Sequence, residues 1–425
     1  MGTPTAEVEA PPVRAVQAWT VTTMSVLFIV VNWADKSILG IAAQPLMEDL
    51  KLSNSELGFI GSAFYFLFSI VGVITGFVAD RVSARWVLLV MVLAWSVTQL
   101  PVLVFATGTA LLISRIALGA AEGPSTAMAS VAAFTWFPQE RRALPAALIS
   151  SGASIAKIAI APVLALIVVG WGWRAAFVVL AVLGLVWAAV WVLVGREGPY
   201  ARSATSAAAA NDDVPFLRIV SRPTFIGAVL GTFAMYALVS VVLTWLPSYL
   251  EKGLGFPRLA AGSMLGLPSV VAMAAMVGIS WFTDRRLSAG GSSRTLRGLV
   301  AAGSLVVGGL LLAALPAAKD VTLAIALVCV GYGIAATSLP LLAACVSRIA
   351  PAGRQGSVLG LYFALQATSG LIAPALTGIL VDAADTPAQG YALAFQVFGV
   401  VAAIGGVSVA LLVHPDRDVA GARGR

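Results

Sequence analysis

The chain has 425 residues, of which 60% are hydrophobic and only 11% are charged, and its mean hydropathy is +0.96. A soluble domain carries about 25% charged residues, so this composition excludes a single water-soluble core and indicates that a lipid bilayer surrounds most of the chain. The two cysteines, Cys329 and Cys345, lie in apolar stretches, and the one histidine is His414. These counts argue against a disulfide framework, a metal site and histidine-based catalysis.

Apolar segments long enough to cross a bilayer, about 20 residues each, recur along the whole chain. We expect twelve membrane helices, at 17–44, 57–79, 86–106, 107–136, 142–169, 173–195, 223–250, 259–283, 297–316, 320–347, 355–381 and 389–413. The longest break contains Gly, Pro, Ser and an alanine run, and should be a flexible linker. The predicted organisation is a cytoplasmic tail (1–16), a six-helix bundle (17–195), the cytoplasmic linker (196–222), a second six-helix bundle (223–413) and a cytoplasmic tail (414–425).

Positive residues are distributed unevenly between the two sets of loops. With both termini inside, the inside loops and tails hold eighteen arginines, and the outside loops hold only Lys51, Arg174, Lys252, Arg258 and Lys319. Cytoplasmic loops carry the excess of Lys and Arg in membrane proteins. We therefore expect a multi-pass protein of the bacterial inner membrane with both termini in the cytoplasm. The formal net charge of +7 is then a topology signal and requires no nucleic acid.

Two short patterns recur at similar offsets in the predicted bundles. The sequence GFVADR (76–81) ends the second span and SWFTDRR (280–286) ends the eighth, while IAP occurs at 160–162 and again at 372–374. The offsets are 204 (284 − 80) and 212 (374 − 162) residues. Two related bundles joined by a linker should enclose a site near the bilayer midplane and expose it alternately to each side.

The stretch 76–85 resembles the signature loop of the major facilitator superfamily, although Ser83 and Ala84 replace the usual glycine and basic residue. This resemblance implies an all-α membrane fold of two pseudo-symmetric bundles. It also implies a charged inner gate, composed of Asp80, Arg81, Arg85, Asp284 and Arg285. The alternative is a solvated turn that only sets the topology.

Several motifs are more specific and resemble the anion:cation symporter family. They are Asn32-Trp-Ala-Asp35-Lys36, Arg115-x-x-Leu118-Gly119-x-x-Glu122-Gly123-Pro124, Trp136-Phe-Pro-Gln-Glu-Arg141, Trp173-Arg174-x-x-Phe177 and Thr244-Trp-Leu-Pro-Ser-Tyr-Leu250. Members of that family include bacterial sugar-acid transporters and the sialic-acid and vesicular glutamate carriers. The superfamily's antiporter signature, a glycine-rich stretch ending in Gly-Pro, is absent from 150–157, which disfavours drug efflux.

Five ionisable residues lie well inside predicted spans of the first half: Asp35, Lys36, Arg115, Glu122 and Lys157. An intramembrane charge costs at least ~2.5–3.5 kcal/mol on insertion scales, so it indicates a function. With every group ionised, the cluster carries a charge of +1, which a bound carboxylate would neutralise. This charge favours an anionic substrate independently of the family resemblance.

Helix geometry separates the roles of these residues. Arg115 and Glu122 lie on one face about 10 Å apart along the axis, so each should meet a group on another helix. Asp35 and Lys36 diverge by about 100°, so one can face the substrate cavity while the other faces a neighbouring helix. Asn32 lies on the same face as Lys36.

We interpret Lys36 as the substrate anchor, at a position where the family resemblance usually has an arginine. The resemblance implies that Asp35 and Glu122 couple protons to transport, and Arg115 would stabilise an acid or link protonation to the gate. The alternative is a static ion-pair network that fixes helix packing. Lys157 matches no family motif: it is either a second anchor, which would favour a dianion or a carboxylate with a second acceptor, or a partner of Glu122 or Asp35.

Weaker candidates for the substrate site are polar and aromatic side chains. They are Asn32, Tyr65, Phe68, Tyr236, Trp245, Ser338, Tyr362, Gln366 and Ser369. Such residues often only pack between membrane helices. Phe68 occupies a position where sugar-acid carriers often have a tyrosine, which favours a less polar or aromatic carboxylate.

Together these patterns predict a secondary active transporter that imports an organic anion by proton symport: a sugar acid, an aromatic acid or a short monocarboxylate. Protons are the expected coupling ion, no other cofactor or metal is expected, and the protein should be a monomer in the bilayer. An exporter or exchanger of small organic compounds is the alternative, and a non-transporting nutrient sensor ranks below it. The sequence has no nucleophile–base pair or phosphate loop that would indicate an enzyme.

Overall fold

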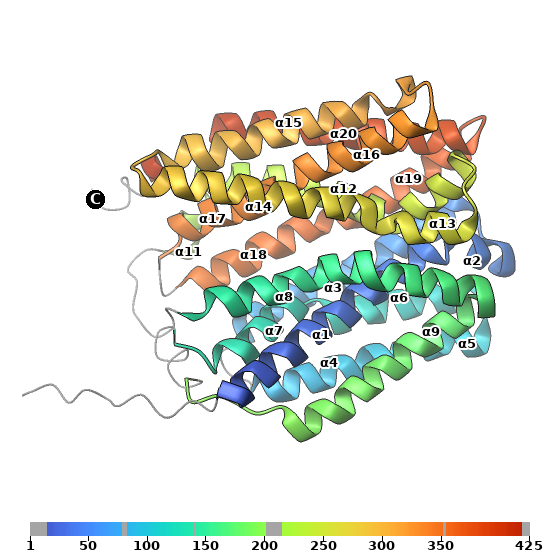
Figure 1. Ribbon diagram of the computed structural model, residues 1–425, viewed down its shortest axis with the longest axis horizontal. Helices are drawn as coiled ribbons and strands as arrows, with labels where there is room; N and C mark the ends of the chain where they lie inside the picture. Colours follow the sequence, from blue (N-terminus) through green and yellow to red (C-terminus); the bar gives the residue numbers. More distant parts are fainter. Residues whose placement is uncertain (1–14, 79–82, 139–140, 201–214, 352–353, 419–425) are drawn as a thin grey trace, which may run out of the picture.

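The computed structural model describes residues 15–78, 83–138, 141–200, 215–351 and 354–418, and its regular structure is helical (Figure 1). The first part of the chain forms α1 (Ala15–Ile41), α2 (Ala43–Leu50), α3 (Asn54–Val78), α4 (Ala84–Thr98), α5 (Leu100–Phe105), α6 (Gly108–Glu122), α7 (Ser125–Phe134), α8 (Ala143–Ile155), the π-helical turn η2 (Ala156–Ile160) and α9 (Ala161–Val194). The second part forms α11 (Phe216–Val220), α12 (Pro223–Ser248), η3 (Tyr249–Gly253), α13 (Arg258–Ser263), η4 (Met264–Gly266), α14 (Leu267–Ser288), η5 (Arg294–Leu299), α15 (Val300–Ala313), η6 (Leu315–Ala317), α16 (Val321–Ala336), α17 (Ser338–Ile349), α18 (Gln355–Ala367), η8 (Thr368–Leu371), α19 (Ala373–Asp382) and α20 (Pro387–Leu412).

These helices form two halves. Figure 1 shows the blue-to-green helices up to α9 in one half and the yellow-to-red helices from α12 onward in the other. The halves meet where α3 packs against α18 and α19, and where α1 packs against α12. Any site formed from α1 and α3 therefore lies beside the seam between the halves.

Within the described residues, ten helical segments are long and apolar enough to cross a membrane. One of them, Leu144–Val194, has 51 residues, far more than the roughly 20 that one crossing needs. Gly172 interrupts it with a φ of 85°, a conformation that only glycine adopts without strain. A second interruption, between α6 and α7, leaves two pieces of 15 and 10 residues. The described helices lie close to the predicted spans, but only ten continuous segments meet this criterion, so the count of twelve crossings stays a prediction.

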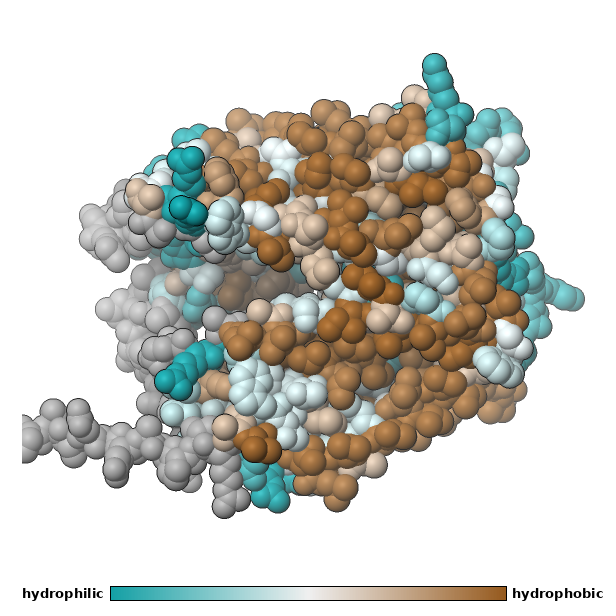
Figure 2. All heavy atoms as spheres, in the orientation of Figure 1, coloured by the Kyte–Doolittle hydropathy of each residue, from teal (hydrophilic) through white to brown (hydrophobic). Residues whose placement is uncertain are grey.

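The outer surface is apolar where lipid would contact it. Figure 2 shows hydrophobic side chains over the middle of the molecule and hydrophilic side chains gathered at its two ends. The exposed large hydrophobic residues include Phe66, Trp86, Leu193 and Ile404, from both halves. A band of this kind between two polar ends is what a bilayer requires of a multi-pass protein.

The halves are tightly joined at one end of the molecule, which we call the closed end. Gly40 of α1 lies so near α12 that a Cβ atom there would be 2.0 Å from the Leu243 carbonyl oxygen, and Gly378 of α19 approaches Asn54 of α3 equally closely. Glu48 forms an ion pair with Arg258 across the seam (3.0 Å). At the opposite end, which we call the open end, Figure 2 shows a hollow between the halves.

The short helix α2 at the closed end is held by residues of α9 that follow its kink at Gly172. Asp49 accepts hydrogen bonds from Trp173 Nε1 (3.0 Å) and from Arg174 Nη1 (2.6 Å). The Arg174 and Trp173 hydrogen bonds hold the pKa of Asp49 below its usual value. Their contribution is therefore present at neutral pH and is lost only as the pH falls through that lowered pKa. The Trp173-Arg174 motif thus has a structural role here.

Asp382, at the end of α19, caps the first turn of α3 across the seam. Its carboxylate accepts from the Ser55 backbone N–H (2.7 Å) and hydroxyl (2.6 Å), and from the Asn54 side-chain amide (2.8 Å). Because an N-cap contributes about 1 kcal/mol, Asp382→Ala should loosen the closed end. We expect faster hydrogen exchange of the first amides of α3 in this variant, measured by mass spectrometry. Asp385→Ala, at an exposed residue in the next turn, is the control, and unchanged exchange in Asp382→Ala would show that the cap does not secure this end.

Candidate functional site

The candidate site begins on α1, whose middle carries polar groups facing several directions. Asn32 and Asp35 are fully buried, and Lys36 retains 6% exposure of its side chain. The ring centroid of Trp33, on the same helix, lies 5.0 Å from Lys36 Nζ. As predicted, Asp35 and Lys36 point to different neighbours.

Two glycines on α6 bring Glu122 to this part of α1. A Cβ atom at Gly119 would be 1.9 Å from the Phe64 carbonyl oxygen, and one at Gly123 would be 2.6 Å from the Phe68 carbonyl oxygen. Glycines four residues apart let helix backbones approach closely within a membrane. α6 therefore packs directly on α3, and Glu122, between the two glycines, lies in the interior of this half with 0% exposure.

The helix ends at this acid. α6 stops at Glu122 and α7 starts at Ser125, with Gly123-Pro124 between them. The Ser125 hydroxyl donates to the freed Glu122 carbonyl, and Asn32 Nδ2 donates to the Ser125 hydroxyl (3.0 Å). Lys36 Nζ donates to Asn32 Oδ1 (2.8 Å) and lies 3.7 Å from Glu122 Oε2. A connected polar path thus runs from the ammonium of Lys36 to the broken end of α6.

Asp35 faces a separate polar group. Gln99, between α4 and α5, donates to its Oδ1 (2.7 Å). Arg115 Nη1 donates to the backbone carbonyl of Asp35 (3.2 Å), and the guanidinium lies over the Phe177 ring at 5.5 Å. Arg115 therefore contacts Asp35 through the Asp35 backbone carbonyl and not through an ion pair with the Asp35 carboxylate. Gln99 was missed by the sequence interpretation, although an amide side chain within the apolar span predicted at 86–106 was a signal for it.

Several polar atoms of this cluster are buried without a hydrogen-bond partner in the described residues. They are Asp35 Oδ2, Gln99 Oε1, Arg115 Nη2 and both carboxylate oxygens of Glu122. Buried polar atoms are usually satisfied, so a group of five requires an explanation. An open carboxylate oxygen can take up a proton, and an open guanidinium N–H can donate to an incoming acceptor.

Lys157 comes from the π-helical turn η2, within the fifth predicted span. Its side chain is buried, with 7% exposure, and its Nζ lies 5.3 Å from the centroid of the Trp33 ring. No ion pair joins it to Glu122, to Asp35 or to another acid in the part of the chain that is described. The predicted alternative in which Lys157 pairs with one of these acids is therefore not what the structure shows.

Aromatic side chains line the cluster on the side of the other half. Phe68 lies 4.9 Å from Lys36 Nζ, and Tyr65 makes an edge contact with Tyr236 across the seam (6.1 Å between centroids). The Tyr65 ring packs so closely on Gly370 that a Cβ atom there would be 2.4 Å away. Phe68 thus lies beside Lys36, and Tyr65 and Tyr236 meet at the seam, while their part in substrate binding stays a prediction.

The remaining second-half candidates are placed differently. Trp245 donates its Nε1 to the Pro374 carbonyl (2.9 Å) and lies near Tyr391, so it packs inside the second half. The hydroxyls of Ser338 and Ser369 each donate to a backbone carbonyl three residues earlier, that of Ala335 in α16 and that of Gln366 in α18. The remaining two, Tyr362 Oη and Gln366 Oε1, are buried without a hydrogen-bond partner among the described residues.

Much of the predicted inner gate falls outside what the structure describes: Asp80 and Arg81 are not covered, nor is the side chain of Asp284. Arg85 donates to the Val192 carbonyl (3.1 Å) and lies over the Trp86 ring. Arg285 lies over the Trp281 ring. Both arginines are at the open end, and the gate itself stays a prediction.

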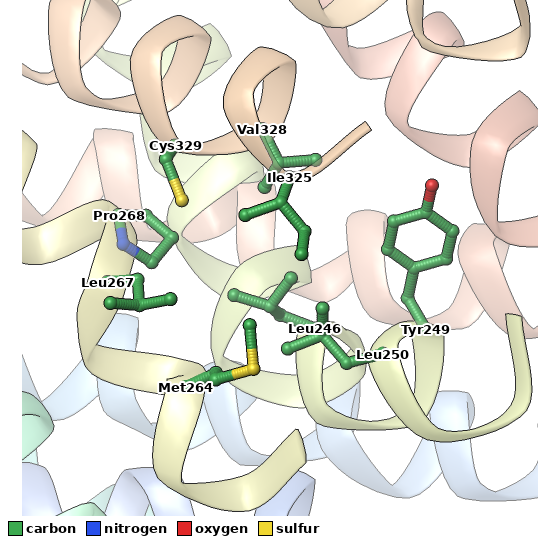
Figure 3. Close-up of a pocket in the computed structure, with 9 residues that line it drawn as sticks. All are labelled: Leu246, Tyr249, Leu250, Met264, Leu267, Pro268, Ile325, Val328 and Cys329. Carbon is green, nitrogen blue, oxygen red and sulfur yellow. The ribbon is translucent and has the colours of Figure 1, made fainter. Parts of the chain in front are cut away.

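Two recesses lie apart from the charged cluster. A small apolar one between α12, α14 and α16, lined by residues including Met264 and Cys329, measures about 10 Å³, room for about one water molecule (Figure 3). A larger one of about 340 Å³ lies at the closed end and is lined by Glu48, Asn54 and Lys252 among others. The first is too small for an organic substrate, and the second is separated from Lys36 by the contacts of the closed end.

Comparison with known proteins gives consistent results. Residues 25–374 match the Major Facilitator Superfamily. The chain is 27% identical to the hexuronate transporter of Bacillus subtilis (strain 168), over 91% of this chain and 92% of that one. It is 26% identical to the D-galactonate transporter of Escherichia coli O6:H1, over 93% and 95%. Among solved structures, a bacterial homologue of the human lysosomal transporter Spinster, in an inward-facing and unoccupied conformation, superposes with a TM-score of 0.76 at 18% identity, covering 95% of this chain and 98% of that one.

Proposed function

Because this chain belongs to the major facilitator superfamily, and is a multi-pass membrane transporter and not an enzyme, we propose that it imports an organic acid together with protons. The observation that carries this proposal is the position of Lys36, a buried ammonium that still retains a small exposed area and is held between Asn32 and Glu122. An anion arriving at Lys36 competes directly with Glu122. Substrate binding and the charge of this acid are therefore linked.

The topology in this proposal has twelve crossings with both termini in the cytoplasm. The 144–194 segment crosses twice because Gly172 divides it, and α6 with α7 crosses once as a broken helix. The excess of arginines at the open end assigns that end to the cytoplasm of a bacterial cell. The closed end then faces outside, and the site is open inward. The proposal also includes two six-helix bundles, at 17–195 and 223–413, joined by the cytoplasmic linker. We propose that the protein is a monomer.

The substrate class is a sugar acid or a related carboxylate. The named substrates of the two relatives, hexuronate and D-galactonate, are both sugar acids. In this chain Phe68 lies beside Lys36, where it can contact the carbon skeleton of a bound acid while the ammonium holds its carboxylate. An aromatic carboxylate would also fit this apolar wall and is a natural comparison compound.

Proton coupling follows from competition for Lys36. In the substrate-free state Glu122 is ionised and pairs with Lys36. When a carboxylate takes that ammonium, Glu122 loses its counter-charge and takes up a proton. Release of substrate to the cytoplasm returns Lys36 to Glu122, which gives up the proton. Asp35, held by Gln99 and near Arg115, is the second proton carrier, and loading of the site lets the halves rock past one another.

Uptake into proteoliposomes under an imposed pH gradient tests this function. With an alkaline interior we expect radiolabelled D-glucuronate or D-galactonate to accumulate, and a protonophore to abolish the accumulation. An anion gradient alone should drive exchange in the absence of a pH gradient. Rapid counterflow with no response to the pH gradient would instead identify an exchanger, and the absence of any uptake of organic acids would overturn the proposal.

A further inference from the structure

The charged cluster contains one cation, Lys157, in addition to Lys36 and Arg115. Lys36 has Glu122 and Asn32, and Arg115 has the Asp35 carbonyl. Lys157 has no carboxylate among the described residues, although more than nine-tenths of it is buried. A buried ammonium without a counter-charge is costly, so its retention needs an explanation other than helix packing.

Lys157 and Lys36 contact the same indole. Their Nζ atoms lie 5.3 and 5.0 Å from the centroid of the Trp33 ring, so they can be no farther apart than the sum of these two distances. The two ammonium groups come from different helices, η2 and α1, and both contact Trp33. A short molecule along the indole could reach both with its two ends.

The local backbone also marks Lys157 as part of a site. It lies in a π-helical turn, a distortion that is frequent at functional positions. The turn meets the second half at Gly266, where a Cβ atom would be 2.6 Å from the Lys157 carbonyl oxygen. A ligand held by Lys157 is therefore bound at the seam where the halves must move.

We infer that Lys157 is a second anion anchor and that the substrate is a short dianion, with one acidic group on Lys36, the other on Lys157, and its carbon chain along Trp33. This inference rests on the proposed function. When Glu122 is protonated and Asp35 is still ionised, the cluster holds three cations, Lys36, Arg115 and Lys157, and one anion, Asp35. A dianion neutralises this loaded site completely, whereas a monoanion leaves one buried positive charge.

A matched pair of probes tests the second anchor. D-glucarate and D-gluconate share a six-carbon polyol chain, and differ in that gluconate has a primary alcohol in place of the second carboxylate. Affinities are measured by calorimetry on the purified full chain. We expect glucarate to bind at least about tenfold more tightly than gluconate, and Lys157→Gln to remove this preference while leaving gluconate affinity within about twofold of the original.

Two further variants keep the test interpretable. Lys157→Arg retains the charge and should retain the preference for glucarate, while Lys319→Gln, at an exposed lysine, should leave both affinities unchanged. Melting temperatures verify that each variant is folded. Equal affinities for the two probes in the unaltered protein, or a preference that survives Lys157→Gln, overturns the second anchor but not the proposed function. No binding or uptake of any organic acid overturns both.

Discussion

Glu122→Gln should abolish proton-driven accumulation of substrate while preserving substrate exchange. Glutamine has the shape of the protonated acid but cannot release a proton, so the variant imitates the loaded state. Lys36 loses its ionic partner, 3.7 Å away in the structure, and remains free to bind the substrate. A pH difference of one unit supports at most about tenfold accumulation for each coupled proton. We expect that ratio in the unaltered protein and a ratio of about one in the variant.

The measurement combines gradient-driven uptake and counterflow in the same proteoliposome preparation. Glu197→Gln, at an exposed acid after α9, is the control and should accumulate substrate normally. Asp35→Asn should also lose accumulation, because its carboxylate is the other buried acid of the cluster. If Glu122→Gln accumulates substrate as well as the unaltered protein does, the Lys36–Glu122 pair is a static packing contact and the coupling mechanism is wrong.

The charged cluster illustrates what a sequence can predict. The five buried ionisable residues were recognisable because any charge within an apolar span is exceptional. The Lys36–Glu122 pair and the separate contact of Arg115 with the Asp35 main chain are consistent with helix geometry, but they could not be derived from it. Which acid meets which base depends on the rotation and spacing of α1, α3 and α6, and that spacing is set by contacts such as Gly119 against Phe64.

Partners that carry no charge were harder to foresee. Gln99 meets Asp35 only because α4 ends there and α5 begins. The Ser125 hydroxyl donates to the Glu122 carbonyl because Gly123-Pro124 breaks the helix and leaves this carbonyl free. Trp33 appeared in a motif, but its contact with Lys157 follows from the π-helical turn of η2, which has no clear sequence signal. Trp245 was predicted to line the substrate site, but it packs inside the second half. The sequence alone does not distinguish a tryptophan in a binding site from one that packs between helices.

Gly40→Leu should give a folded protein that does not transport. A side chain at this position of α1 would collide with the Leu243 carbonyl of α12, at a Cβ distance of 2.0 Å. These helices belong to different halves, which must separate when the closed end opens. The collision can therefore be relieved by the motion that already belongs to the transport cycle, and the variant should remain in the state with this end open. We expect near-complete loss of uptake with a melting temperature close to that of the unaltered protein.

Gly119→Leu is the matched comparison, because a Cβ atom there would be 1.9 Å from the Phe64 carbonyl. The local collision is almost the same, but α6 and α3 belong to one half and stay packed throughout the cycle. No transport motion relieves it, so we expect a loss of stability of about 3 kcal/mol or more and poor recovery of folded protein.

A cysteine introduced at Gln44, which is buried at the closed end, reports on whether this end is open. In a background without the two native cysteines it should react with a maleimide much faster when combined with Gly40→Leu. Slow labelling together with normal uptake would mean that the α1–α12 contact does not form part of the outer closure. If both glycine variants unfold alike, the contact at Gly40 belongs to a rigid core, and the halves must move about a different seam.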